Sequence, residues 1–284
     1  MAQSWDYIAK IVSLGDSGCG KSSLTIRLCE GRFTPHHDVT IGVEFGSRIV
    51  PVGPPASLAL NINNPAPASG ASSPGAAQGP GPPDGSPPAP PPPPPTMTRP
   101  QKHMKLSLWD TAGQETYKSI TRSYFRGASG ALLVFDITRR ATFLSATGWL
   151  HDLRQIAEDG IVVVLVGNKS DLAAAGGGGA AADNLRQVAR DEAAEWCRAN
   201  GVLQYVETSA KSGDGVERAF LEVAERIYQN IEAGKYDLND RRSGVKGAGG
   251  GAGGAGKVNL GVRDGGAGRG RAGGGSQGGW GNCC

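Results

Sequence analysis

Signals for secretion, membrane insertion and disulfide formation are missing or scarce in this sequence of 284 residues. We expect no secretory signal, because the first residues, MAQSWD, contain neither a basic nor an apolar segment. No apolar run approaches the length of a membrane span. The five cysteines lack metal-site spacing, and a disulfide framework is not expected in a chain that stays in the cytosol. The net charge of +3 is too small to indicate a nucleic-acid partner.

Large apolar side chains are scarce in two long segments. Residues 51–101 are rich in Pro, Ala and Gly, and residues 239–284 are dominated by Gly. Neither segment can bury enough apolar surface to offset the entropy lost on ordering. We therefore expect one domain over 5–238, interrupted by a disordered insertion at 51–101 and a Gly/Ala insertion at 173–182. A flexible tail over 239–284 is expected to follow it.

The remaining sequence alternates apolar runs with amphipathic segments. Strands are expected at Tyr7–Leu14, Thr40–Val52, Lys105–Trp109, Ala131–Ile137, Ile161–Gly167 and Leu203–Glu207. Helices are expected at Lys21–Cys29, Thr142–Ala157, Leu185–Ala199 and Val216–Glu232. This order predicts an α/β fold with right-handed crossovers, in which ligands bind at the carboxyl ends of the strands.

A glycine-rich motif, Gly15-x4-Gly20-Lys21-Ser22, lies between the first expected strand and the first expected helix. This is the context of a P-loop, whose glycines let backbone N–H groups turn towards phosphate oxygens. Lys21 is expected to reach the β- and γ-phosphates, and Ser22 to bind Mg²⁺. The alternative is a glycine-rich turn without a ligand. The candidate nucleotide-binding residues here are Gly15, Asp16, Ser17, Gly18, Cys19, Gly20, Lys21, Ser22 and Ser23.

A second motif, Asp110-Thr111-Ala112-Gly113-Gln114, follows the strand that ends at Trp109. A carboxylate at the end of a buried strand is costly unless it meets a cation, so Asp110 is expected to hold Mg²⁺ through water. A helix N-cap is the alternative for Asp110. Gly113 can offer its N–H to the γ-phosphate, and Gln114 is placed to orient an attacking water. Together with Lys21, these two residues are the candidate catalytic residues.

A third motif, Asn168-Lys169-Ser170-Asp171, follows the strand Ile161–Gly167. The Asp171 carboxylate can accept hydrogen bonds from guanine N1–H and the 2-amino group, two donors that adenine lacks. Lys169 would lie along the base. The segment Glu207-Thr208-Ser209-Ala210-Lys211 follows the last strand, where the N–H of Ala210 can bond guanine O6. The candidate base-binding residues are Asn168, Lys169, Asp171, Ser209, Ala210 and Lys211.

With these motifs the sequence resembles the Ras superfamily and, within it, the Rab GTPases. The resemblance extends to Ile41-Gly42-Val43-Glu44-Phe45, Tyr124-Phe125-Arg126-Gly127-Ala128 and Leu133-Val134-Phe135-Asp136-Ile137-Thr138. It covers about residues 5–238 apart from the insertions. Thr40–Arg48 and Ile231–Gly234 are most similar to the Rab-four branch, with the Rab-two and Rab-fourteen branches close.

The resemblance implies a P-loop NTPase (small G-protein) fold. This is a six-stranded, mostly parallel sheet with helices on both faces, and the insertion would form a long disordered loop in the hairpin between the switch strands. It implies binding of GTP, GDP and Mg²⁺, and GTP hydrolysis that is slow without a GTPase-activating protein (GAP). Thr40 matches the switch threonine that binds Mg²⁺, so the implied metal ligands are Ser22, Thr40 and Asp110.

Several aromatic residues have two open interpretations. Phe33 matches the aromatic residue that packs on guanine, but it is also placed to be a hydrophobic staple near a helix end. Phe45, Trp109 and Tyr124 match an aromatic triad that effectors contact, and they equally suit core positions between the strands and switch II. One segment departs from the Rab pattern: Thr116–Ile120 reads TYKSI, so the following helix is expected to present effectors with a different face.

The tail ends in Cys283-Cys284, and the resemblance implies double geranylgeranylation there, with exposed free thiols as the alternative. The basic side chains of 239–284 suit an anionic membrane surface or simply keep a Gly-rich tail soluble. In the insertion, Pro90–Pro95 favours polyproline II and could dock an SH3-like or WW-like groove. A lineage-specific spacer or retained intron sequence is the plainer interpretation of 51–101.

The function implied is a GTP-hydrolysing switch in vesicle-mediated trafficking. Its expected place is the cytoplasmic face of endosomal, vesicle or Golgi membranes, with a cytosolic pool. The implied partners are an exchange factor, a GAP, a GDP-dissociation inhibitor, a prenylation escort protein and Rab effectors. The alternative is a scaffold that never switches and binds partners through its Pro-rich loop. Asp171 argues against a P-loop ATPase or a nucleotide kinase.

Overall fold

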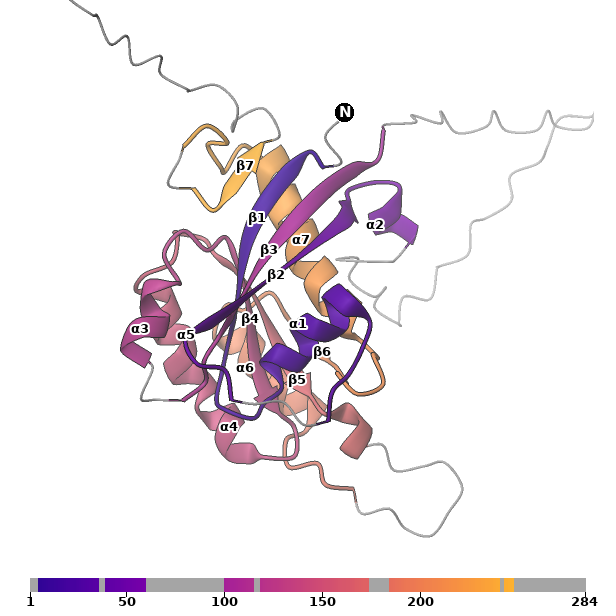
Figure 1. The fold of residues 1–284 in the computed structure, drawn as a ribbon, viewed down its shortest axis with the longest axis vertical. Helices are drawn as coiled ribbons and strands as arrows, with labels where there is room; N and C mark the ends of the chain where they lie inside the picture. The colour runs from indigo at the N-terminus through magenta and orange to yellow at the C-terminus, as the bar shows by residue number, and fades with distance from the viewer. Residues whose placement is uncertain are drawn as a thin grey trace, which may run out of the picture. The chain divides into compact units, whose positions relative to one another are not determined.

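The part of the chain that this computed structural model describes is built around a seven-stranded sheet (Figure 1). The strands are β1 (Tyr7–Leu14), β2 (Val43–Val52), β3 (Lys102–Thr111), β4 (Gly130–Asp136), β5 (Val162–Asn168), β6 (Gln204–Glu207) and β7 (Val245–Gly247). The α-helices are α1 (Lys21–Glu30), α2 (Ala56–Ala59), α3 (Lys118–Ser123), α4 (Arg140–Leu144), α5 (Ala146–Arg154), α6 (Arg190–Ala199) and α7 (Val216–Glu232). The described residues are 5–35, 39–59, 100–114, 118–173, 184–240 and 243–247, all within the unit Met1–Gly251.

The sheet has the strand order β2-β3-β1-β4-β5-β6, and β7 pairs with β1. The pairs β1–β3, β1–β4, β4–β5 and β5–β6 are parallel, while β2–β3 and β1–β7 are antiparallel. The path from β2 to β6 confirms the predicted α/β P-loop fold with six mostly parallel strands. Because the carboxyl ends of parallel strands meet at one edge, the loops that carry the motifs come together there.

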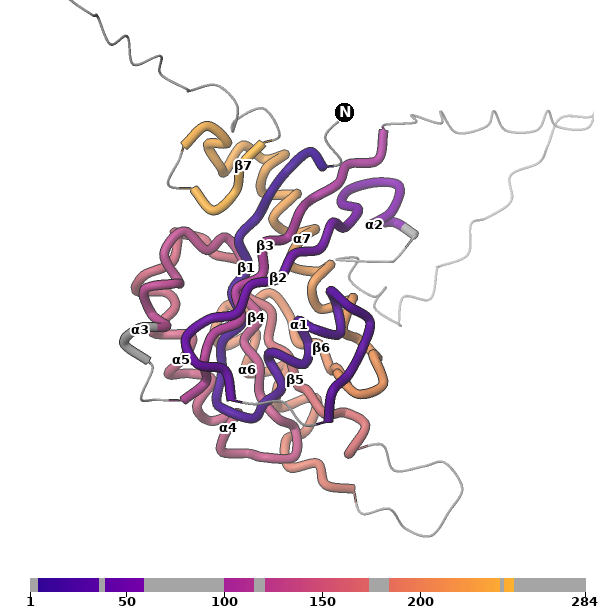
Figure 2. Tube along the Cα trace, viewed as in Figure 1, coloured from indigo at the N-terminus to yellow at the C-terminus, as the bar shows by residue number. Residues whose placement is uncertain are grey.

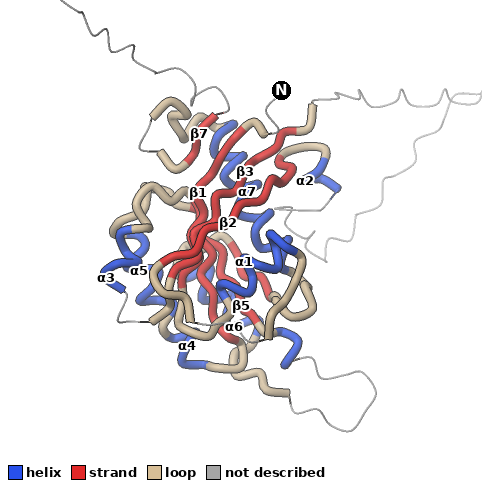
Figure 3. Tube along the Cα trace, in the orientation of Figure 1, coloured by secondary structure: helices blue, strands red, loops and turns tan. Residues whose placement is uncertain are grey.

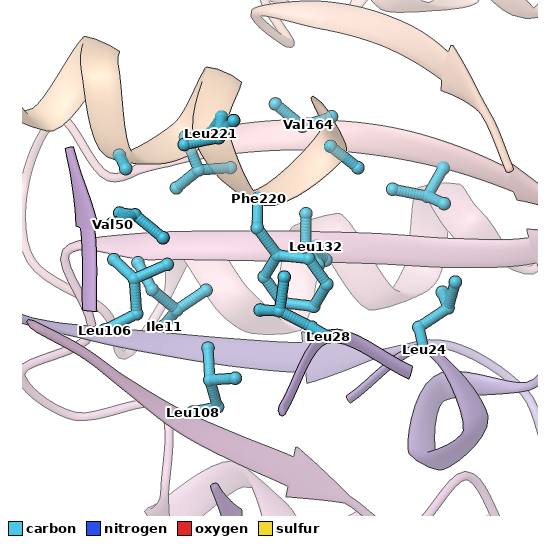
Figure 4. Packing of buried hydrophobic residues seen from close by; sticks show 14 of the residues in the cluster. Ile11, Leu24, Leu28, Val50, Leu106, Leu108, Leu132, Val164, Phe220 and Leu221 are labelled. Atoms are coloured by element: carbon cyan, nitrogen blue, oxygen red, sulfur yellow. The ribbon is translucent and has the colours of Figure 1, made fainter. Parts of the chain in front are cut away.

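Helices cover both faces of the sheet (Figure 3). On one face α1 and α7 pack against alternate strand residues, including Ile11, Leu132 and Val164. The ring of Phe220, a residue of α7, lies in the middle of this cluster (Figure 4). On the other face α5 and α6 pack against the intervening residues, such as Leu133. Successive strand side chains point to opposite faces, and this alternation divides the core into two clusters.

Several of the expected elements differ at their ends by one residue, and β3 extends over Lys102–Thr111 rather than Lys105–Trp109. Three other differences have a local cause. β2 begins at Val43 rather than Thr40, because Gly42 has φ of 79° and breaks the extended backbone. The helix expected at Thr142–Ala157 begins earlier and is divided into α4 and α5 at Ser145, whose Oγ donates to Ala141 O at 3.1 Å. The helix expected from Leu185 begins only at Arg190. The preceding segment is tied to the residue that follows β4, since Gln187 N donates to Ile137 O at 2.8 Å.

The ends of the large insertion are folded, which corrects the expectation that 51–101 is wholly disordered. β2 and β3 run side by side (Figure 2). β2 continues to Val52, which pairs with Lys102 at the far end of the hairpin from the Val43–Thr111 pair. Gly53 N donates to Glu225 Oε2 at 2.7 Å, and Gln101 Nε2 donates to Val52 O at 2.8 Å. Residues 60–99, including Pro90–Pro95, lie outside the described residues. A deletion meant to leave the domain intact should therefore remove 60–99 only.

Strand β7 was not predicted, because it lies beyond residue 238 in the expected flexible tail. It pairs with the first residues of β1, matching Val245 with Ala9. β4 pairs with β1 only from Ile11 onwards, so the first residues of β1 are open to β7 on that side. Val245 is fully buried. Gly244 N donates to Glu158 Oε1 at 2.5 Å. A Cβ on Gly244 would clash with the Gly127 carbonyl, so this close approach requires glycine.

Replacing Val245 with alanine is expected to lower the free energy of unfolding by about 2 kcal/mol, because it removes buried methyl groups and leaves a small cavity. Urea unfolding followed by far-UV circular dichroism would measure the change. The matched control is Lys246→Ala, since Lys246 is exposed on the same strand. Equal midpoints for both variants and the wild type would show that β7 adds nothing to stability.

None of the described helices is long and apolar enough to cross a membrane.

Candidate functional site

A cavity of about 660 Å³ lies at the carboxyl edge of the sheet, within the size range of small-molecule sites. The predicted site residues that line it are Ser17, Gly18, Gly20, Lys21, Ser22, Ser23, Phe33, Thr40, Gly113, Asn168, Lys169, Asp171, Ala210 and Lys211. The fold therefore gathers the three motifs and the segment after β6 around one space. Of the other predicted residues, Asp16, Cys19, Asp110 and Ser209 contact this group from behind the lining, as described below.

The P-loop has the backbone shape that its glycines predict. Gly18 and Gly20 have φ of 75° and 92°, in the left-handed region. Lys21 opens α1, and its Nζ donates to the carbonyls of Gly15 and Asp16 at 2.8 and 3.0 Å. A Cβ on Gly113 would clash with Lys21 Nζ, so the two phosphate-binding candidates lie against each other.

Burial lowers the pKa of the Lys21 ammonium, although the nearby Asp110 carboxylate partly offsets this effect. A buried cation beside an open cavity favours an anionic ligand. The polarity of the P-loop therefore fits a phosphate group.

Three oxygen-bearing side chains meet beside Lys21. Ser22 Oγ lies 2.8 Å from Thr40 Oγ1 and donates to Asp110 Oδ2 in a short hydrogen bond. Asp110 is fully buried at the end of β3. Two hydroxyls and one carboxylate are hard donors of the kind that Mg²⁺ uses when it keeps several waters and binds substrate phosphates. The set offers no histidine nitrogen or cysteine sulfur, the ligands that are typical of a structural zinc site. Asp110 lies within β3 and the next described helix, α3, begins at Lys118, so the helix N-cap interpretation of Asp110 is wrong, while its metal role stays a prediction.

The base-binding segments are held together by their own side chains. Asn168 Nδ2 donates to Cys19 O at 2.8 Å, which links the loop after β5 to the P-loop. Ser209 Oγ donates to Asp171 Oδ1 at 2.7 Å and so fixes the carboxylate expected to bind guanine. The N–H of Ala210, expected to bind guanine O6, points at Asn168 Oδ1 at 3.2 Å. Its role towards a base stays a prediction.

Two of the predicted residues, Asp16 and Gln114, do not line the cavity. The Asp16 side chain is turned away from the lining, because its Oδ1 accepts from Trp149 Nε1 at 2.7 Å. Gln114 is half-buried and does not line the cavity, so its catalytic role stays a prediction. Phe33 lines the cavity and also packs against the α1–α7 core cluster, which supports both of its interpretations.

The tertiary structure adds residues that no motif in the sequence had selected. Thr34, Pro35, Val39 and Leu172 also line the cavity. Arg27, on α1, donates through Nε to Ala210 O at 2.8 Å and also through its NH2 group to Lys211 O. Trp149, on α5, supports the P-loop through Asp16. No local sequence signal marks Arg27 or Trp149, because their partners lie far away along the chain.

Replacing Trp149 with phenylalanine is expected to speed GDP release about tenfold. The ring is kept, but the hydrogen bond to a charged partner in the P-loop is lost. Stopped-flow release of a fluorescent GDP would measure this change. Trp196→Phe is the matched control, because Trp196 Nε1 donates to Thr147 Oγ1 at 3.2 Å, between α6 and α5. Equal release rates for the two variants would contradict a supporting role for Trp149.

Two ring contacts join the three predicted aromatic residues, with Trp109 in the middle. The Phe45 and Trp109 ring centroids are 4.6 Å apart, and those of Trp109 and Tyr124 are 5.7 Å apart. Phe45 is 65% exposed, so the core interpretation is wrong for this residue. Ile41 is 77% exposed, which extends an apolar surface over β2 and the segment before it. Such a surface is typical of a protein-binding site.

A sequence model described as Ras family matches this chain over residues 10–66 and 95–229, which is more than half of its length. The matched residues include the P-loop, Thr40, Asp110–Gln114, Asn168–Asp171 and Ser209–Lys211.

Proposed function

The chain belongs to the Ras family of small GTPases, and from this premise we propose that it is a Rab-type switch in vesicle-mediated membrane trafficking. Members of this family bind guanine nucleotides and hydrolyse GTP. One observation supports the site assignment most directly. Lys21, Ser22, Thr40 and Asp171 line a single cavity, and Asp110 contacts Ser22 from outside this lining. The nearest branch proposed is Rab-four, from the segments Thr40–Arg48 and Ile231–Gly234.

In the proposed reaction, water attacks the γ-phosphorus of GTP as the bond to the β-phosphate oxygen breaks, giving GDP and phosphate. Lys21 and the N–H of Gly113 stabilise charge on the phosphate oxygens, and Gln114 orients the water. Ser22, Thr40 and Asp110 are the residues that would hold Mg²⁺. When bound, this ion neutralises charge on the phosphates.

The proposed switch uses the two segments that reach the γ-phosphate. In the GTP state, Thr40 and Gly113 hold their segments in one arrangement, and hydrolysis releases them. Thr40 lies next to the exposed Ile41, and Gly113 follows the strand that carries Trp109. We therefore propose that effectors bind the apolar surface formed by Ile41, Phe45 and Trp109 when both segments are ordered.

Membrane attachment is proposed to depend on Cys283 and Cys284, which lie outside the described residues. Two prenyl chains give stable attachment, whereas one gives marginal binding. The proposed location is the cytoplasmic face of endosomal, vesicle or Golgi membranes, with a cytosolic pool held by a GDP-dissociation inhibitor. An exchange factor, a GAP and an escort protein complete the proposed cycle.

This proposal is tested by prenylation in vitro with a Rab escort protein and its transferase, followed by flotation with anionic vesicles. The wild-type chain is expected to float with the vesicles, and the Cys283→Ser/Cys284→Ser double variant to stay in the soluble fraction. The single variants are expected to fall between them, because each loses one chain. A wild-type chain that accepts no prenyl group would overturn the membrane part of the proposal.

A further inference from the structure

The roles assigned above leave one buried carboxylate beside the site without a function. Asp136 ends β4, the central parallel strand, and its side chain is 1% exposed. Its Oδ1 accepts from Thr138 N at 2.9 Å and from Thr138 Oγ1 at 2.6 Å. Its Oδ2 faces two cations, Arg139 and Lys169. Both carboxylate oxygens are therefore engaged. Only Oδ2 contacts side chains, those of Arg139 and Lys169, that connect Asp136 to other loops.

The first cation, Arg139, connects Asp136 to the P-loop. Arg139 Nε donates to Asp136 Oδ2 at 3.1 Å, and its NH2 group donates to Ser17 O at 2.9 Å. The same NH2 group lies 3.8 Å from Cys19 Sγ. A Cβ built on Gly18 would lie 3.3 Å from it. The guanidinium therefore spans the gap between the end of β4 and the outer turn of the P-loop.

The second cation, Lys169, connects Asp136 to the base-binding loop. Lys169 Nζ lies 2.7 Å from Asp136 Oδ2. The Lys169 backbone has φ of 70°, and the next residues form the 3-10 turn Ser170–Leu172, which carries Asp171. An ion pair that anchors Lys169 therefore also limits how far this turn can move from β4.

We propose that Asp136 is a positioning residue that couples the phosphate-binding loop to the guanine-binding loop through Arg139 and Lys169. The inference rests on the guanine-nucleotide site proposed above. Without this carboxylate, two cations would face each other beside a largely buried position, and their repulsion would separate the two loops. The Asn168–Cys19 hydrogen bond also joins the loops, but it carries no net charge and does not reach the outer turn at Ser17.

The ionisation of Asp136 is consistent with this role. Burial raises the pKa of Asp136, but hydrogen bonds from Lys169 and Thr138 outweigh it, so the pKa lies below its ordinary value. The carboxylate is charged at neutral pH and can balance one of the two cations.

The experiment measures release of a fluorescent GDP from the full chain in stopped flow. Asp136→Asn is expected to speed release by about 10- to 100-fold, because a charged acceptor for two cations becomes a neutral amide. The matched control is Glu222→Gln on α7. The Glu222 side chain is also 1% exposed and pairs with an exposed arginine, Arg218, at 3.3 Å, so this variant carries a similar change in the core away from the nucleotide. It is expected to alter release less than twofold.

A second comparison separates coupling from a general loss of stability. Arg139→Met alone is expected to speed release about tenfold, but to cause no further increase in the Asp136→Asn background, since its link is already lost there and its removal also takes away one of the two repelling cations. Arg140→Met is its control, because Arg140 pairs with Glu192 at 2.5 Å instead of contacting the P-loop. If Asp136→Asn does not fold, the Arg139→Met and Arg140→Met pair still decides the question, because both side chains are nearly half exposed.

The outcomes are distinct. A wild-type chain that binds no GDP would overturn the nucleotide site and the inference together. A wild-type chain that binds GDP, with Asp136→Asn or Arg139→Met releasing it at the wild-type rate, would overturn the inference alone. Effects of Asp136→Asn and Arg139→Met that multiply fully in the double variant would show two independent contributions and would also overturn the coupling.

Discussion

Replacing Gln114 with leucine is expected to slow GTP hydrolysis by about 10²-fold, because the attacking water loses the amide that orients it. Leucine has a similar volume, and Gln114 does not line the cavity, so GDP binding is expected to stay within twofold of wild type. Single-turnover phosphate release from Mg²⁺·GTP measures the hydrolysis rate. Fluorescent GDP titration measures the binding.

The same assay should be run on a chain that lacks residues 60–99, because the structure places the folded ends of the insertion at 51–59 and 100–101. If both the full and the shortened chains hydrolyse GTP and their Gln114→Leu variants stall, the switch is supported and the insertion is a spacer. Hydrolysis by the shortened chain alone would indicate an inhibitory insertion or an artefact of the gene sequence. Tight GTP binding without turnover in any form would favour the non-switching scaffold.

Replacing Asp171 with asparagine is expected to weaken GDP binding by about 10⁴-fold, because guanine N1–H and the 2-amino group would lose their carboxylate acceptor. Xanthine carries a carbonyl in place of the 2-amino group, and the amide of asparagine can donate to it. The variant should therefore bind XDP more tightly than the wild type does. The Asn side chain can still accept from Ser209 Oγ, which donates to Asp171 at 2.7 Å, so the loop should keep its position.

Isothermal titration with GDP and XDP would measure both affinities. Asp214→Asn is the matched control, because Asp214 accepts from Ser212 Oγ at 2.7 Å in the adjacent turn and does not line the cavity. It is expected to bind GDP normally. Equal loss of GDP and XDP binding in the Asp171 variant would indicate that the loop had collapsed and that Asp171 does not select the base.

The sequence alone determined the chemical groups of this site. The P-loop glycines, Lys21 and Ser22 lie within one short segment, so their spacing predicts both the turn and the phosphate contacts. The same holds for Asp110–Gln114 and for Asn168–Asp171. The apolar runs of β4 and β5 predicted buried parallel strands, and this topology requires the loops that follow them to meet at one edge.

Only the tertiary structure decided which distant side chains hold those groups in place. Trp149 supports Asp16 across 133 positions of sequence, and Arg139 reaches Ser17 across 122. Strand β7 forms because Val245 is buried beside β1, although its neighbours in sequence are mostly small and polar. A local motif specifies backbone shape and chemistry within a few residues. Contacts between distant segments depend on how the chain packs, and one sequence contains no periodic signal for them.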